Sequence, residues 1–184
     1  LQAQQKLNEY AAMMPNRYAT VNPAANAGLV EGMKGLFNPV DTISRQFKNG
    51  MMGEGVLGYE EINMSQSIKL HTTGTRAATG ATVNGNASEG ATTITLASAG
   101  NALTFTVGDV FTVADCFSVN PQTRESTGSL QQFTVTAANT STSGGAVTLA
   151  VSPALYSPSN ALASVSTLTI TGKAVVFLGA ASTS

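Results

Sequence analysis

The chain has 184 residues, of which 10% are charged, and its nine basic and ten acidic side chains leave a net charge of −1. A protein that binds nucleic acid mainly by neutralising phosphates needs a dense basic face, so this composition excludes that class. The single cysteine, Cys116, excludes an internal disulfide framework and a cysteine-based zinc site. No apolar run approaches the roughly 20 residues of a membrane-spanning helix.

The N-terminal residues have the apolar spacing of a helix. Leu7, Tyr10, Ala11 and Met14 recur at i, i+3, i+4 and i+7, so they form one apolar stripe on a helical backbone. Proline does not continue a helix, because it lacks the backbone N–H and clashes with the preceding turn. The spacing therefore predicts a helix that ends at Pro15.

A second helix is expected after a short extended run over residues 18–21. Asn22 is a favoured N-cap residue, and Pro23 suits the first helical position, where its missing N–H costs no intrahelical hydrogen bond. The apolar face expected for this helix consists of Ala25, Leu29, Met33 and Leu36.

The stretch from residue 38 to residue 64 contains a glycine motif. Asn38-Pro39 repeats the helix start signal and predicts a short helix over 40–47, and residues 59–64 have the pattern of a strand. Between them, residues 53–58 (GEGVLG) match the G-x-G-x-x-G pattern of dinucleotide-binding proteins. That pattern holds a pyrophosphate only after a strand and at the start of a helix, and here the order is the opposite. We interpret the motif as a flexible glycine turn.

The composition of the chain changes near residue 71. From there to the C-terminus it has 22 Thr and 14 Ser, and residues 77–184 carry only six charges. Apolar residues alternate with Thr or small residues in seven short runs, which predicts antiparallel strands with one buried and one solvated face. These runs are 93–96, 103–107, 110–113, 133–135, 147–151, 168–170 and 174–177. Such a series of short strands favours a closed or nearly closed barrel, or a sandwich.

No group of side chains indicates an active site, a metal site or a cofactor site. His71, the only histidine, lies in the Thr- and Gly-rich stretch 70–81, which has the composition of a linker, so we expect it to be solvated. Cys116 follows Asp115, whose charge raises the pKa of a thiol, so we expect an unreactive thiol that is buried or half-buried. Asp109 lies at a predicted turn, where Asp bonds to its own backbone.

Two stretches of the chain resemble one known family. Residues 16–68, with the Asn-Pro helix start, the turn MKGLF and the loop GMMGEGVLGY, are similar to the shell-forming domain of one family of tailed-bacteriophage major capsid (coat) proteins, that of phage P-twenty-two. Residues 103–137, with FTVGDVFTVA, VNPQT and QQFTVTA, resemble the β-barrel that is inserted into that domain. The order and spacing of the two stretches agree with the family.

The resemblance implies an α+β fold: part of a capsid shell domain of the Hong Kong type, followed by an inserted antiparallel β-barrel of about six to seven strands. We therefore expect a segment of the shell domain (its A/P-domain) at residues 1–70, the barrel at 71–179 and a tail at 180–184. The family chain is longer and this one begins at Leu1 rather than Met, so we expect a fragment.

This chain departs from the family at two places. Some relatives carry a long charged loop early in the barrel, whereas the corresponding stretch here, residues 82–91, is short and has Glu89 as its only charge. Asp115-Cys116 stands where a Gly-Val-like pair is expected, which we expect to alter a local bend.

The resemblance also implies a structural role rather than catalysis. Coat subunits of this family assemble with one another as pentamers and hexamers on a scaffolding protein, and the shell encloses DNA without sequence-specific binding and without a membrane. The expected location is the virion capsid, assembled in the bacterial host cytoplasm, with no cofactor, and the barrel is expected to support subunit folding and shell geometry. Candidate intersubunit contacts are Leu36, Phe37, Met51, Met52 and Glu89.

A second interpretation is a Thr/Ser-rich β-domain of a phage tail fibre or adhesin that binds a glycan or receptor. Sugar-binding sites use exposed aromatic side chains for stacking. This chain has no Trp and four Tyr, of which only Tyr156 lies in the β part. The aromatic content therefore disfavours this interpretation.

Overall fold

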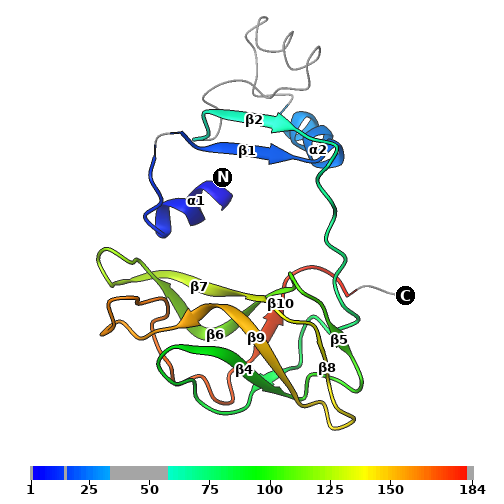
Figure 1. Cartoon of the computed structure of the whole chain (residues 1–184), viewed down its shortest axis with the longest axis vertical. Coiled ribbons are helices and arrows are strands. Elements are labelled where there is room, and N and C mark those ends of the chain that lie inside the picture. The colour runs from blue at the N-terminus through cyan, green and yellow to red at the C-terminus, as the bar shows by residue number, and fades with distance from the viewer. Residues whose placement is uncertain (1, 15, 34–57, 182–184) are drawn as a thin grey trace, which may run out of the picture. The chain divides into compact units, whose positions relative to one another are not determined.

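The computed structural model describes residues 2–14, 16–33 and 58–181, which fall in two compact units, Leu1–Leu70 and His71–Ser184. Each unit has its own secondary structure (Figure 1). The predicted helix over 40–47 and nearly all of the glycine turn lie outside the described residues. The same is true of four candidate contact residues, Leu36, Phe37, Met51 and Met52.

The described residues of the first unit form two helices and a two-stranded parallel sheet. Its elements are α1 (Gln2–Glu9), β1 (Tyr18–Val21), α2 (Pro23–Met33) and β2 (Glu61–Met64). β1 and β2 pair along their full length. The predicted N-cap is confirmed, because the side-chain Oδ1 of Asn22 accepts a hydrogen bond from the backbone N–H of Ala25 at 2.7 Å.

The first helix is shorter than its apolar stripe predicts, because α1 ends at Glu9 rather than at Pro15. The guanidinium of Arg17 donates hydrogen bonds to the carbonyls of Ala12 and Met13 at 2.6 and 2.8 Å. The helix ends where Ala11 adopts a left-handed backbone conformation (φ 53°), and Arg17 then satisfies the carbonyls of the turn that follows.

The apolar face predicted for α2 is wrong at its first position. Ala25 is exposed and Leu29 is half-buried, whereas Asn26, a polar residue, is buried. The side chain of Met33 lies outside the described residues. A helix that contacts a small two-stranded sheet buries a narrow strip of its surface, which the 3.6-residue period alone does not locate.

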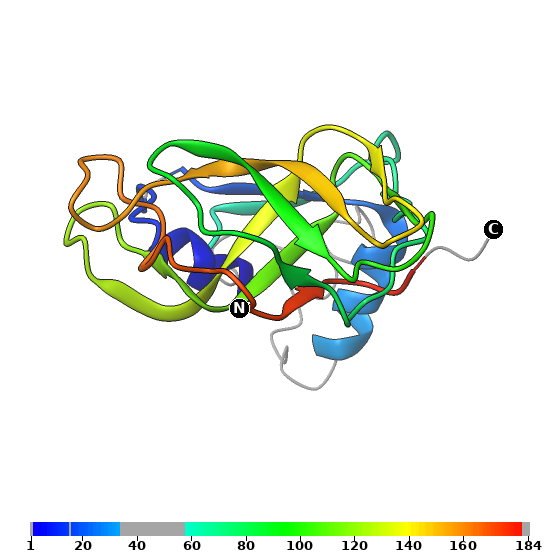
Figure 2. The same ribbon diagram turned by 90° about the horizontal axis from the view of Figure 1, so that it is seen from below.

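The second unit, which we call the β unit, is a six-stranded antiparallel barrel with a small extra strand pair. Its strands are β3 (Thr82–Val83), β4 (Ala91–Ala97), β5 (Thr104–Phe105), β6 (Val110–Val119), β7 (Ser126–Val135), β8 (Asn139–Thr140), β9 (Val147–Leu155) and β10 (Val175–Phe177). The order in the main sheet is β10-β6-β7-β9-β4-β3, and β5 pairs with β8. The first and last strands then meet, because Thr82 bridges Ala174 and the N–H of Val83 donates to the carbonyl of Lys173 at 2.9 Å. The predicted barrel is confirmed (Figures 1 and 2).

The barrel interior is filled by the apolar residues that alternate along the strands. At its centre, the ring of Phe111 lies 5.7 Å from that of Phe133 and 5.1 Å from that of Phe177, which in turn lies 5.4 Å from Phe105. All four rings are buried. Each large buried ring of this kind stabilises a core by about 3–5 kcal/mol relative to alanine.

The long hairpin of β6 and β7 extends beyond the runs that alternation predicts. β6 continues past residue 113 to Val119. Along it the register with β7 shifts between Thr112 and Phe117, and Asp115 adopts a left-handed backbone conformation (φ 60°). This is a β-bulge, which bends the strand at a position that favours glycine. Whether Asp115-Cys116 alters this bend relative to a Gly-Val-like pair stays a prediction.

Two other expectations for the β unit are wrong. The run 168–170 is not a strand, although Ile170 is only 1% exposed and packs into the core. The stretch 70–81 is not a linker along its whole length, because Gly74, Arg76 and Ala81 are buried. Segments without strand hydrogen bonds thus complete the barrel core.

Candidate functional site

The chain enters and leaves the β unit at one place, which we call the neck (residues 71–78, 104–109 and 177–180). The side-chain Oγ1 of Thr73 donates to the carbonyl of Ala180 at 2.7 Å. Five residues further in, the N–H of Phe177 donates to the carbonyl of Ala78 at 2.9 Å. The incoming and outgoing segments are therefore held side by side by direct hydrogen bonds.

A buried ion pair lies at the centre of the neck. Arg76 and Asp109 are both 0% exposed, and the Nε of Arg76 lies 3.4 Å from the Oδ2 of Asp109. The guanidinium of Arg76 also lies 4.6 Å from the centroid of the Phe177 ring, and its Nη2 donates to the carbonyl of Leu178 at 2.6 Å. One arginine thus connects the incoming segment to both the β5–β6 turn and the outgoing segment.

The carboxylate of Asp109 is also bound by backbone N–H groups and by the histidine. The N–H groups of Thr106 and Gly74 donate to its Oδ2 at 2.9 and 3.4 Å, and the Nε2 of His71 lies 3.1 Å from its Oδ1. Burial by itself raises the pKa of Asp109, but the Thr106 N–H, the His71 bond, the Arg76 charge and the Gly74 N–H together lower the pKa below its ordinary value.

Two predictions are settled by this geometry. The backbone bond of Asp109 at a turn is confirmed. His71 is exposed, as expected, with 42% of its side chain accessible, but it is not a free linker residue, because its Nε2 lies 3.1 Å from the buried carboxylate of Asp109. Arg76 was not among the residues that the sequence pattern singled out. Its one available signal was a lone arginine in a stretch almost without charges, where burial requires a carboxylate partner.

Glu89, a candidate for contact between subunits, is bound within its own unit. Its carboxylate accepts hydrogen bonds from the backbone N–H of Ser157 at 3.3 Å and from the hydroxyl of the same residue. It therefore connects the 84–90 turn to the loop that follows β9. Its contact role stays a prediction.

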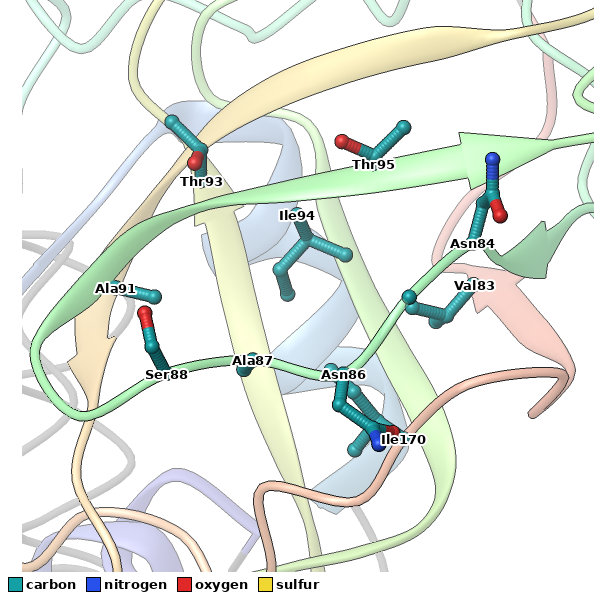
Figure 3. A pocket seen from close by; sticks show the side chains of 11 residues that line it. Val83, Asn84, Asn86, Ala87, Ser88, Ala91, Thr93, Ile94, Thr95 and Ile170 are labelled. Atoms are coloured by element: carbon teal, nitrogen blue, oxygen red, sulfur yellow. The ribbon is translucent and has the colours of Figure 1, made fainter.

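A small pocket of about 180 Å³ lies beneath the 84–88 segment and is bounded by β4 and Ile170 (Figure 3). Its lining contains the amides of Asn84 and Asn86, hydroxyls and short apolar side chains, with no ionisable group. The Oδ1 of Asn86 already accepts the N–H of Thr171 at 3.1 Å. Such a lining lacks the titratable side chains that acid–base or nucleophilic chemistry requires.

Cys116 is 0% exposed, as predicted, and burial raises the pKa of its thiol to about 12. A thiol that stays protonated at neutral pH is a poor nucleophile and a poor metal ligand. Within the described part of the chain, no three His, Cys, Asp or Glu side chains are grouped closely enough to bind a metal ion. None of its helices has the length and hydrophobicity that a membrane span requires.

Comparison with solved structures finds a similarity to the CUS-3 coat protein I-domain. The match has a TM-score of 0.39 and 25% sequence identity, and it covers 54% of this chain and 95% of that one. No protein-family model matches the chain, and a search of curated proteins finds no match either.

Proposed function

We propose that this chain is part of a structural subunit of a bacteriophage icosahedral capsid, in which the β unit is a domain inserted into the shell-forming domain. Two stretches support this, residues 16–68 and 103–137, which resemble the coat family in the expected order and spacing. The role is structural and requires no catalytic group, metal or cofactor.

The neck is the observation that carries the proposal. A domain can be inserted into a loop of another domain only when its own ends lie close together, because the host must continue on both sides. Here the incoming residue Thr73 and the outgoing residue Ala180 share a hydrogen bond of 2.7 Å, and the buried Arg76 of the incoming segment donates to the carbonyl of Leu178 in the outgoing one. The neck thus meets the geometric requirement for insertion.

The barrel has the properties of a domain that supports the folding of its host. It has its own core and a closed set of strand pairs, and its longest pairing is a hairpin of neighbouring strands, β6 with β7. Local pairings form faster than pairings between distant segments, because less loop-closure entropy is lost. We propose that the barrel forms early and, once formed, holds the two sides of the shell domain in register and influences shell geometry.

The remaining partners follow from the same proposal. The first unit is a segment of the shell domain, and its contacts are with other coat subunits in pentamers and hexamers and with a scaffolding protein. Leu36, Phe37, Met51 and Met52 are proposed contact residues. The net charge of −1 suits a wall that encloses DNA without sequence-specific binding, because a strongly basic wall would hold the genome against it. The location is the virion capsid, assembled in the host cytoplasm.

The test is electron microscopy of the particles formed when the complete parent reading frame is expressed with its upstream neighbours. Closed icosahedral shells are expected. Well-folded soluble monomers or trimers without shells would reject the capsid proposal and direct the work to a glycan screen for a tail-fibre or adhesin module.

A further inference from the structure

The β unit has eight charged or titratable side chains of the Asp, Glu, Lys, Arg and His types, and six of them have partners within the unit. Three of the six are His71, Arg76 and Asp109 in the neck. The others are Glu89, which accepts hydrogen bonds from Ser157, and Lys173, whose Nζ lies 2.5 Å from the Oδ2 of Asp115. The other two, Arg124 and Glu125, make no side-chain hydrogen bond or ion pair among residues 2–14, 16–33 and 58–181. Arg124 and Glu125, which are adjacent and of opposite charge, are thus the two charges of the unit that have no side-chain partner among those residues.

The two free charges lie at the tip of the β6–β7 hairpin, defined here as residues 120–125, at one end of the β unit (Figure 1). The tip is held in one shape by its own hydrogen bonds. The Oδ1 of Asn120 accepts the N–H groups of Gln122 and Thr123 at 2.9 and 3.3 Å, and the N–H of Arg124 donates to the carbonyl of Asn120 at 2.8 Å. Residues 121–126 are all exposed.

We propose that this hairpin tip is a contact site for the same tip of a second copy of the chain. In the contact, Arg124 of each copy pairs with Glu125 of the other. Adjacent opposite charges are self-complementary under a two-fold axis, because residue i of one copy then meets residue j of the other and the reverse. The fixed backbone of the tip reduces the entropy that such a contact loses.

The contact is weak, and it contributes to an assembly only when many copies of it are present together. An exposed ion pair contributes little alone, and salt screens it, so two such pairs do not hold a stable dimer. A closed assembly repeats one contact many times, and multiple weak contacts then select a geometry. In that sense the inference rests on the proposed function, although the contact itself needs only two copies.

The test uses the whole chain with the substitution Gln122→Cys and follows disulfide-linked dimer under mild oxidation. The matched control is Ser143→Cys, in an exposed turn between β8 and β9. Cys116 does not compete, because it is buried and its pKa is raised to about 12. At low salt, the dimer of Gln122→Cys is expected to form roughly five-fold faster than that of the control, as two exposed ion pairs allow.

Charge variants separate pairing from simple exposure. With Gln122→Cys present, Arg124→Glu is expected to reduce the rate to that of the control. The exchange of both charges, Arg124→Glu with Glu125→Arg, is expected to restore it, and high salt is expected to remove the difference. Equal rates for the two cysteine positions, or a rate that Arg124→Glu leaves unchanged, would overturn the proposal. So would a failure of the exchange to restore it, provided that the variants keep the melting temperature of the parent.

The outcome is independent of the shell experiment. Shells combined with equal cross-linking rates would reject the tip contact and keep the capsid proposal. Fast, charge-dependent cross-linking without shells would keep the contact and reject the capsid proposal. Association of the tip with a different protein would also give control rates of cross-linking and count against self-contact.

Discussion

The neck and the hairpin tip use the same kinds of charged residue for opposite purposes. In the neck, Arg76 and Asp109 are fully buried and bonded to several groups, whereas at the tip Arg124 and Glu125 are exposed and have no side-chain partner in the described part of the chain. A buried charge that loses its partner is left without solvation, while an exposed one is returned to water. The difference predicts that neck substitutions change the stability of the β unit and that tip substitutions change only association.

The largest effect is expected for Arg76→Met, which leaves the buried carboxylate of Asp109 without its cation. We expect a loss of about 3–5 kcal/mol in the free energy of unfolding of the β unit. The matched control, Arg124→Met at the exposed tip, is expected to stay within about 0.5 kcal/mol of the parent. Urea denaturation of the three proteins measures both, and similar values for the two variants would remove the distinction between neck and tip.

A smaller effect is expected for Gly74→Ala in the neck. A Cβ at this position would lie 2.1 Å from the carbonyl oxygen of Thr104, so the backbone of one segment must move. Overpacking of this kind costs about 1–3 kcal/mol. Gly144→Ala is the control, because the nearest atom to its Cβ is a hydroxyl at 3.9 Å. Thermal melts of the two variants give the comparison, and an unchanged Gly74→Ala protein would contradict the close approach of these segments.

Acid is expected to weaken the neck through Asp109. The pKa of Asp109 is lowered in the folded protein, so its carboxylate stabilises the fold above the unfolded value of about 3.9. This stabilisation is lost as the pH falls through the lower folded value. Melting temperatures between pH 6 and pH 2 should therefore drop more for the parent than for Asp109→Asn, whose neck is already weakened at neutral pH. A parallel fall in both proteins would show that other groups cause the acid loss.

Limited proteolysis of the parent protein requires no substitution and tests the boundary of the neck. Lys69 is exposed in a stretch with few backbone hydrogen bonds, while Arg76 is 0% exposed. Trypsin needs several residues of accessible, extended chain, so we expect a cut after Lys69 and none after Arg76 while the β unit is folded. Mass spectrometry over time identifies the cuts. Early cleavage after Arg76 would mean that the neck opens in solution.

Features that depend on neighbouring residues were predicted well. The N-cap at Asn22 and the strand over 18–21 agree with the structure, because capping and extension are decided within a few residues. The runs 93–96 and 147–151 lie inside β4 and β9, which pair with each other. Their alternation places apolar side chains on one face, and a barrel is the closed arrangement that buries that face in a short chain.

Features that depend on distant residues were not predicted. β7 begins at Ser126, far ahead of the predicted run 133–135. Its first half is polar and has no apolar alternation, so it is a strand because it pairs with β6 and not because of its own residues. Ile170 is buried without belonging to a strand. Four of the five candidate contact residues lie outside the described part of the chain, so the contact interpretation for them stays a prediction.

By itself, the sequence determined the class of the second unit: a weakly charged, Thr-rich chain that alternates in short runs buries its apolar face as antiparallel β-structure. Only the tertiary structure decided which charges are paired. Arg76 and Asp109 are 33 positions apart, and nothing in the local pattern of either residue indicates the other. Their pairing follows from barrel closure, which brings the incoming segment, the β5–β6 turn and the outgoing strand together at the neck and leaves the hairpin tip in solvent.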